Sequence, residues 1–313
     1  MRHPATWGMG CGVTVLIPVL ISACSAQISG APGDRVSPDA PVAPPAPPPI
    51  DGPVALGPWG TPATIPQAAS TTSSEDDDTL SASALEMIFA VDGGTSGKDL
   101  FYTARKSVTE PWATAVPVPF NSAQSDETPR LSDDGLTLYF ASGRAGNGNL
   151  DIWSVTRGAL DNTSWGTPEL QTDVSTTTLL EKWFMPCGAG HYVMIQGTAT
   201  NGTDLVEGTR GGAAPTPITE LNSAQSETGT LVSKDCLTIF FASNRPTSSS
   251  PARIYTSHRS SLTAAWDPPS VVSDFPIPGG NGSQEDPWLS EDGRTFVFAS
   301  DAKGTKDIYI STR

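Results

Sequence analysis

LSDDGLTLYFAS spans Leu131–Ser142, and LSEDGRTFVFAS, which is nearly the same, spans Leu289–Ser300. Both stretches begin with Ser-x-Asp-Gly and continue into a run in which large apolar residues alternate with their neighbours. Aspartate accepts backbone hydrogen bonds in tight turns, glycine permits a positive φ, and alternation with a period of two is typical of a strand. The repeated stretch therefore predicts a tight turn that leads into a core strand.

The spacing of tryptophans shows how often this unit recurs. Trp59, Trp112, Trp165 and Trp266 are separated by 53, 53 and 101 residues, so one period near 51 lacks its tryptophan. Each period is a unit of about fifty residues that ends in arginine, which is the sequence signature of a repeat architecture. A weaker copy of the opening stretch, LTIFFAS at 237–243, lies in the fourth unit. The chain therefore contains five units, of which the first and third are degenerate.

Each unit contains four short runs rich in β-branched and aromatic residues, separated by Gly, Asn, Asp, Ser and Pro. Four short strands that recur in this way are typical of a β-propeller blade. We predict an all-β chain that forms a single propeller of about five four-stranded blades, with six blades as the alternative. The fifth unit supplies three strands, so an N-terminal strand near PWGTPATIP (58–66) is expected to join the last blade and close the ring.

These motifs resemble the TolB-type β-propeller repeats, whose consensus is close to L-S-x-D-G-x-x-L-x-F-x-S followed by D-I-Y or D-I-W. The resemblance covers residues 58–313. The matching residues are Leu131-Ser132-Asp134-Gly135 with Asp151-Ile152-Trp153, Ser233-Asp235 with Ile254-Tyr255, and Leu289-Ser290-Asp292-Gly293 with Asp307-Ile308-Tyr309. The third unit lacks the Ser-x-Asp-Gly turn, and the fourth has Cys236 where glycine is expected. The resemblance implies a propeller, but such repeats occur in binding proteins, peptidase gating domains and envelope proteins alike.

The N-terminus has the features of an export signal. Arg2 precedes an apolar run that ends in VTVLIPVLI, and Ile21-Ser22-Ala23-Cys24 resembles the bacterial lipobox. We expect a signal peptide at 1–23 and a lipid on Cys24, which would anchor the protein to the outer membrane of a bacterial envelope, facing the periplasm or the cell surface. The alternatives are a plain secretory signal and an uncleaved anchor, and the apolar run is shorter than the ~20 residues that an anchor needs to span a bilayer. Residues 24–57 are rich in proline without amphipathic period, which predicts a disordered tether before a propeller at 58–313.

Composition limits the classes of partner. Gly and Pro make up about 19% of the chain, against roughly 12% in average proteins, which favours turns over long helices. The formal net charge of −15 argues against nucleic acid and against anionic membrane surfaces as partners, because both would repel the chain. Cations, neutral glycans and other proteins remain.

Catalytic motifs are missing from the sequence. His191 and His258 are the histidines that follow the predicted signal, and neither lies in a nucleophile motif. No zinc spacing or phosphate-binding glycine loop is present, and the segment 147–151 offers only one carboxylate for Ca²⁺. Asp134 and Asp292 are interpreted as turn residues. We therefore predict a non-catalytic protein with no cofactor and no metal site.

Acidic residues precede the first predicted strand in four of the units. If these strands line the central channel, their acids gather at its mouth, on the face that also carries two arginines from just after the second strands. These residues then form either ion pairs between blades or an electronegative funnel for a cation or a basic segment of a partner. The acids Glu75, Asp76, Asp77 and Asp78 belong to the first unit, and the binding candidates are Asp126, Glu127, Glu227, Glu285, Asp286, Arg144 and Arg245.

Two cysteines remain after the signal and the lipidation site. Cys187 and Cys236 occupy corresponding turns of the third and fourth units, so adjacent blades would bring them near each other. In an oxidising compartment this arrangement predicts a disulfide, and two buried free thiols are the alternative.

The sequence leads to two functional hypotheses. The first is a lipid-anchored, monomeric binding module whose acidic loop face takes another envelope protein or a surface ligand. The alternative is a glycan-binding or glycoside-cleaving propeller in which Glu127, Glu227 and Glu285 converge. The enzyme requires two carboxylates about 5 to 9 Å apart in an open pocket, whereas in the binding module each acid can have its own arginine or backbone donor.

Overall fold

The protein is described by a computed structural model that covers most of the predicted propeller. The described residues are 56–68, 72–93, 97–188, 190–198, 202–273 and 282–313. They belong to a compact unit, Val54–Arg313. The signal peptide, the lipidation site Cys24 and the tether up to residue 55 lie outside the described residues and stay predictions.

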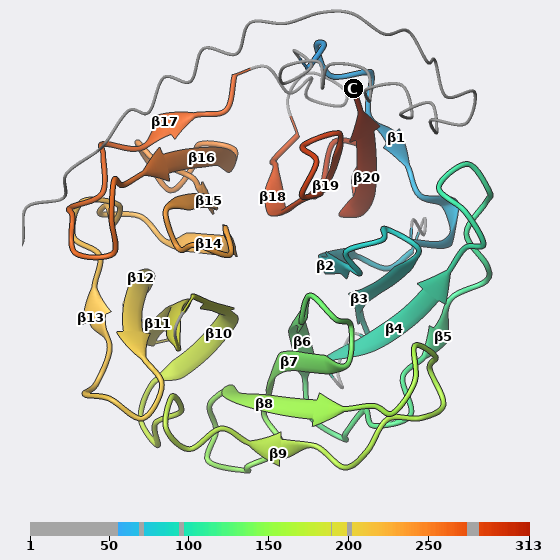
Figure 1. The fold of residues 1–313 in the computed structure, drawn as a ribbon, viewed down its shortest axis with the longest axis horizontal. Helices are drawn as coiled ribbons and strands as arrows, with labels where there is room; N and C mark the ends of the chain where they lie inside the picture. The colour runs from blue at the N-terminus through green and yellow to red at the C-terminus, as the bar shows by residue number, and fades with distance from the viewer. Residues whose placement is uncertain (1–55, 69–71, 94–96, 189, 199–201, 274–281) are drawn as a thin grey trace, which may run out of the picture. The chain divides into compact units, whose positions relative to one another are not determined.

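Within the described ranges the chain forms five antiparallel sheets of four strands, arranged in a ring with the first strand of each unit innermost (Figure 1). Residues of all five inner strands line one cavity at the centre of the ring, and we call this central space the channel. The predicted all-β propeller is confirmed with five blades, which excludes the six-bladed alternative. The blades are β2 (Glu75–Leu80), β3 (Glu86–Asp92), β4 (Lys98–Ala104) and β5 (Val116–Pro117); β6 (Asp126–Leu131), β7 (Thr137–Ser142), β8 (Asp151–Thr156) and β9 (Glu169–Leu170); β10 (Leu180–Cys187), β11 (His191–Thr198), β12 (Gly202–Thr209) and β13 (Thr216–Pro217); β14 (Glu227–Val232), β15 (Thr238–Ser243), β16 (Arg253–His258) and β17 (Ser270–Val271); and β18 (Glu285–Leu289), β19 (Thr295–Ser300), β20 (Asp307–Thr312) and β1 (Ala63–Thr64).

The ring closes through the N-terminal strand, as the sequence predicts. β1 pairs with β20 in the fifth blade, with Ala63 opposite Ile310 and Thr64 opposite Tyr309. A short 3-10 helix, Pro66–Ala68, follows β1 and buries Ala68 in the core between the fifth and first blades. The last blade therefore combines strands from both ends of the propeller, and closure depends on their pairing.

The Ser-x-Asp-Gly turns have the same hydrogen bonds in three blades. In the second blade Ser132 Oγ donates to Asp134 Oδ1 at 2.6 Å, the Leu136 amide donates to the same oxygen at 2.9 Å, and Gly135 has a φ of 68°. Equivalent bonds are made by Asp235 and Asp292. All three carboxylates are exposed and bonded within their turns, which agrees with a structural role for Asp134 and Asp292.

The tryptophan period of the sequence reflects a stacking contact. The arginine that ends a unit lies over a tryptophan ring, with the guanidinium carbon 4.2 to 4.6 Å from the ring centre. The same arginine donates from Nε to the carbonyl of the turn residue at the glycine position. The pairs are Arg105 with Trp112, Arg157 with Trp165, Arg259 with Trp266, and Arg313 with Trp59. In the third blade, which has no such tryptophan, Arg210 pairs with Asp173 at 2.6 Å and lies over Phe184.

Cys187 and Cys236 form a disulfide between the third and fourth blades. Cys236 has a φ of 59° and stands where Gly135 and Gly293 stand in other blades. This bond joins residues 49 positions apart and links two turns at the end of the channel.

Removing this disulfide is expected to destabilise the propeller. The double variant Cys187→Ala/Cys236→Ala should lower the free energy of unfolding by about 2–4 kcal/mol, because a cross-link over such a loop restricts the unfolded chain. Urea unfolding followed by tryptophan fluorescence measures the change. An unchanged midpoint in the double variant, together with free thiols in the native wild type, would contradict the cross-link.

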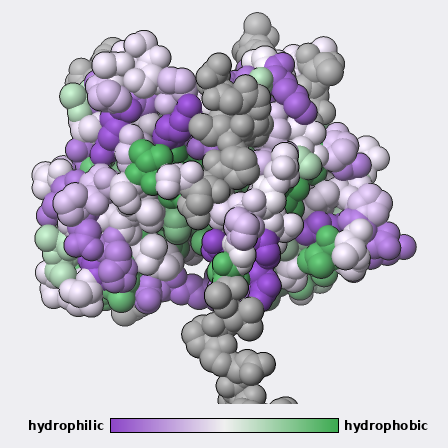
Figure 2. Space-filling model, turned by 90° about the horizontal axis from the view of Figure 1, so that it is seen from above, coloured by the Kyte–Doolittle hydropathy of each residue, from purple (hydrophilic) through white to green (hydrophobic). Residues whose placement is uncertain are grey.

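The edge of the ring is mainly hydrophilic. Figure 2 shows hydrophobic residues only in small, separate patches on this side. The large hydrophobic side chains that are exposed are scattered, as with Val108 and Leu160, which lie on different loops.

Among the described residues no helix has the length and apolar character needed to cross a membrane.

Candidate functional site at the mouth of the channel

The inner strand of every blade contains a bulge near its start. β2, β6, β10, β14 and β18 each shift register against their second strand. We number the positions of this bulged segment from its first residue, which is Glu75, Asp126, Glu181, Glu227 or Gln284 in the five blades. The residue at the third position has a positive φ in each strand, between 46° and 54°. These residues are Asp77, Thr128, Trp183, Gly229 and Asp286. Because the bulge is repeated around the ring, equivalent side chains of all five blades meet at one end of the channel, which we call the mouth.

At the first position, two of the predicted binding candidates are buried in ion pairs and are not exposed at the mouth. Asp126 is fully buried and pairs with Arg144 at 2.7 Å, and Glu227 is fully buried and pairs with Arg245 at 2.8 Å. Each arginine comes from the same blade as its acid. Arg245 also donates to the carbonyl of Leu221. These four predicted binding candidates therefore lie in ion pairs within a blade, rather than between blades, and brace the loop before the inner strand.

The acids at the second and third positions, together with three lysines, form what we call the channel-mouth cluster. One of these lysines, Lys182, is itself the second-position residue of the third blade. Lys98 Nζ lies 2.6 Å from Asp76 and 2.8 Å from Asp77. The other two lysines make equivalent contacts, at 2.8 Å from Lys182 to Glu127 and 2.8 Å from Lys306 to Glu285. The cluster consists of Asp76, Asp77, Glu127, Glu285, Asp286, Lys98, Lys182 and Lys306.

The three lysines were missed by the sequence analysis. Lys98 begins β4, and Lys306 directly precedes β20. Both stand immediately before the aspartate that opens a third strand, Asp99 and Asp307, so the repeated Lys-Asp pair was an available signal. Lys182 lies in the degenerate third unit, where no motif marks it. Glu127, Glu285 and Asp286 are brought together as predicted candidates, whereas Glu227 stays apart from them in its pair with Arg245.

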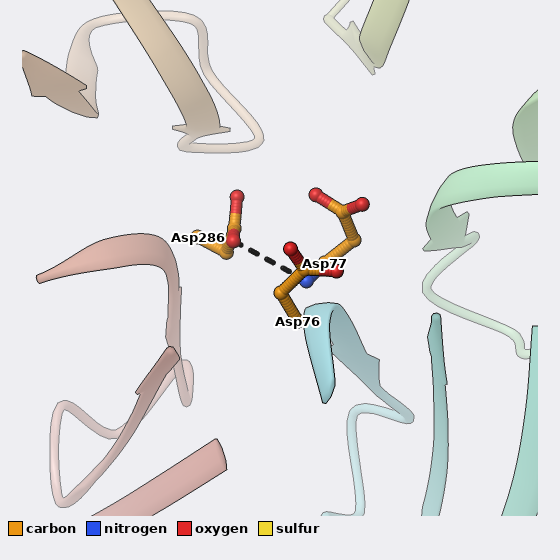
Figure 3. A group of neighbouring side chains, drawn as sticks. All are labelled: Asp76, Asp77 and Asp286. Carbon is orange, nitrogen blue, oxygen red and sulfur yellow. Dashed lines mark hydrogen bonds between the residues drawn. The ribbon is translucent and has the colours of Figure 1, made fainter. Parts of the chain in front are cut away.

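Three aspartates form the most buried part of the cluster. Asp76 and Asp77 come from β2, and Asp286 faces them from β18 (Figure 3). One oxygen of each lies within 4.8 Å of the others. The Asp77 amide donates to Asp286 Oδ2 at 3.3 Å, and Trp183 Nε1 donates to Asp286 Oδ1 at 3.1 Å. The trio is thus held by a hydrogen bond between its own two strands, by Trp183 from the inner strand of the third blade, and by Lys98.

The charges of this trio differ because their surroundings differ. Burial, with the neighbouring charge of Asp77, raises the pKa of Asp76 to about 6. Burial opposes ionisation of Asp77 too, but the charge and hydrogen bond of Lys98 outweigh it and lower the pKa of Asp77 to about 2. Burial and the charge of Asp77 raise the pKa of Asp286 well above its usual range. The surroundings therefore favour the ionised form of Asp77 and the protonated form of Asp286.

Three close carboxylates are a possible set of ligands for a hard cation. Here the ammonium group of Lys98 already lies in hydrogen-bonding contact with two of them. A metal ion at this point would have to displace that ammonium, so we assign no metal to the trio.

A small polar cavity of about 310 Å³ lies beside the cluster, between the fourth and fifth blades. Its lining includes Thr228, Asn244, Ser283 and Glu285. Hydroxyl and amide groups therefore surround Glu285, one of the cluster's acids. A polar group that enters this cavity can reach the Glu285 side chain.

Comparisons with known proteins agree with the fold. No family profile and no curated protein sequence matches the chain. Solved structures that are similar include TolB from Acinetobacter baumannii, at 11% identity over 79% of this chain and 56% of that chain, with a TM-score of 0.47. The catalytic domain of the Coprinopsis cinerea GH62 α-L-arabinofuranosidase has 10% identity over 82% and 97% of the two chains and a TM-score of 0.54. The endo-arabinase of Bacteroides thetaiotaomicron has 10% identity over 80% and 96%, and a TM-score of 0.53. At 10% identity and TM-scores above 0.5, the chain is similar to the last two proteins in its fold, and the comparison extends no further.

Proposed function

We propose that this protein is a non-catalytic binding module whose channel-mouth cluster takes a basic segment of a partner. The observation that supports this is that each acid of the cluster has a donor within the chain. Asp76 and Asp77 have Lys98, Glu127 has Lys182, Glu285 has Lys306, and Asp286 has the indole of Trp183. A carboxylate that serves as acid or nucleophile in glycoside cleavage must instead face an open substrate site.

The charge balance of the cluster favours a cationic partner. Even with Asp286 protonated, four carboxylates face three lysines. The lysine side chains retain 20 to 28% exposure, so a lysine or arginine from a partner can approach from the solvent side and share these acids. Complementary charge of this kind mainly sets specificity and the rate of association.

We also propose that the module acts as a monomer at the bacterial envelope. This rests on the lipobox-like Cys24 and the proline-rich tether, which would hold the propeller away from its lipid anchor. The partner is then another envelope protein or a surface ligand.

Neutralising the second-position acids tests the binding face. The variant Glu127→Gln/Glu285→Gln is expected to weaken binding of a lysine-rich peptide about tenfold at low salt, because two attractive charges are lost. Fluorescence anisotropy with a labelled tetralysine peptide measures the affinity. The matched control is Asp133→Asn/Glu291→Gln, which removes two exposed acids from the turns at the opposite end of the channel. Equal affinities for wild type and the first variant would count against this face.

Crosslinking then identifies the natural partner. The purified protein is crosslinked in a bacterial envelope extract, and the adducts of wild type and of Glu127→Gln/Glu285→Gln are compared. An adduct that depends on these acids supports the proposal, whereas recovery of neither protein nor glycan undercuts it.

A glycan-active propeller is the second candidate. It is favoured by the trio of aspartates, because the pKa of Asp286 is raised while the pKa of its neighbour Asp77 is lowered. Two carboxyl groups whose pKa values are pushed apart are typical of acid and base pairs. Incubation with arabinan and arabinoxylan oligosaccharides is expected to release no reducing sugar. Release that disappears in Asp77→Asn and in Asp286→Asn would replace the binding module with an enzyme.

A further inference from the structure

The channel holds a second, larger cavity at the end opposite the mouth. The inner strands begin at the mouth cluster, and their last residues line a cavity of about 810 Å³. Its wall includes apolar side chains from four blades: Leu80, Met185, Leu231 and Trp288. This volume lies within the range of roughly 300–1,000 Å³ found for small-molecule sites.

Arg130 supplies a buried positive charge to this cavity. Its side chain comes from β6, lines the cavity and is only 3% exposed as a residue. Nη1 donates to the carbonyl of Asp78 at 2.8 Å and Nη2 to the carbonyl of Thr230 at 3.0 Å. The guanidinium is therefore fixed in position by the neighbouring first blade and by the fourth blade, which does not adjoin its own.

This guanidinium makes no direct ion pair. Among the described residues, Arg130 has no carboxylate within 4.0 Å, and its Nε has no hydrogen-bond partner. The charges of Asp78, Asp286 and Asp77 act on it from a greater distance. Asp78 is itself buried, and burial raises the pKa of its carboxyl group to about 8. A buried cation that has no direct ion pair and keeps an unbonded N–H group is costly, and a carboxylate matches the geometry of guanidinium.

The outer rim of the cavity carries charged side chains that are joined only by exposed ion pairs. Lys234, from the turn of the fourth blade, pairs with Asp133 of the second at 3.2 Å and with Glu291 of the fifth. These three side chains occupy the variable position of the repeated Ser-x-Asp-Gly turn and are 56 to 67% exposed. Exposed ion pairs contribute only about 0–1 kcal/mol each, so they present little barrier to entry. Arg210, also on the rim, is already paired with Asp173.

We propose that this cavity binds an amphipathic monocarboxylate, whose carboxylate meets Arg130 and whose apolar body packs against Leu80, Met185, Leu231 and Trp288. One deep cation within an apolar wall favours a single negative charge at the end of an alkyl or aryl group. The site is separate from the channel-mouth cluster and does not depend on the function proposed for it.

Titration calorimetry with sodium decanoate, below its micellar concentration, tests the site on the purified full chain. We expect saturable binding with a stoichiometry of one, at least tenfold tighter than binding of 1-decanol, which has the same chain without the charge. Leu231→Trp fills the cavity and is expected to abolish binding, while Arg130→Gln weakens it at least tenfold. Val271→Trp, on the exposed outer strand β17, is the matched control and should bind as wild type does.

Three results overturn the proposal: no saturable binding of decanoate, equal affinity for decanoate and decanol, or unchanged binding in Leu231→Trp. Arg130 also joins three blades, so Arg130→Gln is checked for folding by circular dichroism. If that variant does not fold, the comparison of decanoate with decanol decides whether charge contributes, and Leu231→Trp decides whether the ligand lies in the cavity.

Discussion

Replacing Gly229 with alanine is expected to lower the free energy of unfolding by about 3 kcal/mol or more, whereas the same replacement at Gly146 should cost about 1 kcal/mol. Both glycines have a positive φ, 52° and 72°, so both variants carry the backbone strain of a left-handed residue. They differ in their surroundings. A Cβ at Gly229 would lie 2.5 Å from the Asp286 amide nitrogen and 2.9 Å from its Oδ1, while nothing lies within 4 Å at Gly146.

Gly146→Ala is therefore the matched control for backbone strain, and the difference between the two variants measures the clash at the mouth. Urea unfolding gives both values. Equal destabilisation would show that the fourth and fifth blades do not approach each other at this bulge. Because the clash involves Asp286, Gly229→Ala should also disturb the trio, and its affinity for the tetralysine peptide provides a second readout.

The fold was largely predictable because its determinants are local and repeated. The hydrogen bonds of the Asp134 turn join residues no more than five positions apart, and the alternation of Leu138 and Phe140 marks a strand without any knowledge of its partners. The stacking of arginine on tryptophan also recurs once in most units, so it appears in the sequence as a period. Counting strands was then enough to predict that β1 completes the fifth blade.

The site was less predictable because it depends on the bulges. Asp126 and Glu127 are adjacent, yet the first is buried against Arg144 and the second faces Lys182. Neighbouring strand residues point to opposite sides, so an error of one position exchanges a structural acid for a site acid. Gly229 is the one glycine among the five residues with positive φ, and Thr128 and Trp183 have no preference for that conformation, so the sequence does not mark the position in every blade. Lys182 reaches Glu127 from another blade, and this contact follows only from the assembled ring.

Replacing Asp78 with asparagine is expected to stabilise the protein increasingly as the pH rises. Asp78 is fully buried, and neither carboxylate oxygen has a hydrogen-bond partner among the described residues. Burial raises its pKa from 3.8 to about 8, against the attraction of Arg130. Between these values the folded protein retains a proton that the unfolded chain releases, so the free energy of unfolding falls as the pH increases from about 4 to about 8. Asparagine is neutral at every pH, so the variant does not lose this part of the free energy of unfolding as the pH rises.

The stabilisation of Asp78→Asn relative to wild type should grow by roughly 3–4 kcal/mol between pH 5 and pH 9, since one pKa unit corresponds to about 1.4 kcal/mol. Urea unfolding at pH 5, 7 and 9 measures it. Asp267→Asn, at an exposed position between β16 and β17, is the control and should change stability by less than about 0.5 kcal/mol at each pH. Parallel pH profiles for wild type and Asp78→Asn would mean that Asp78 ionises normally in the folded protein. In that case Arg130 would have a charged neighbour at neutral pH, and the need for a ligand carboxylate in the large cavity would be correspondingly weaker.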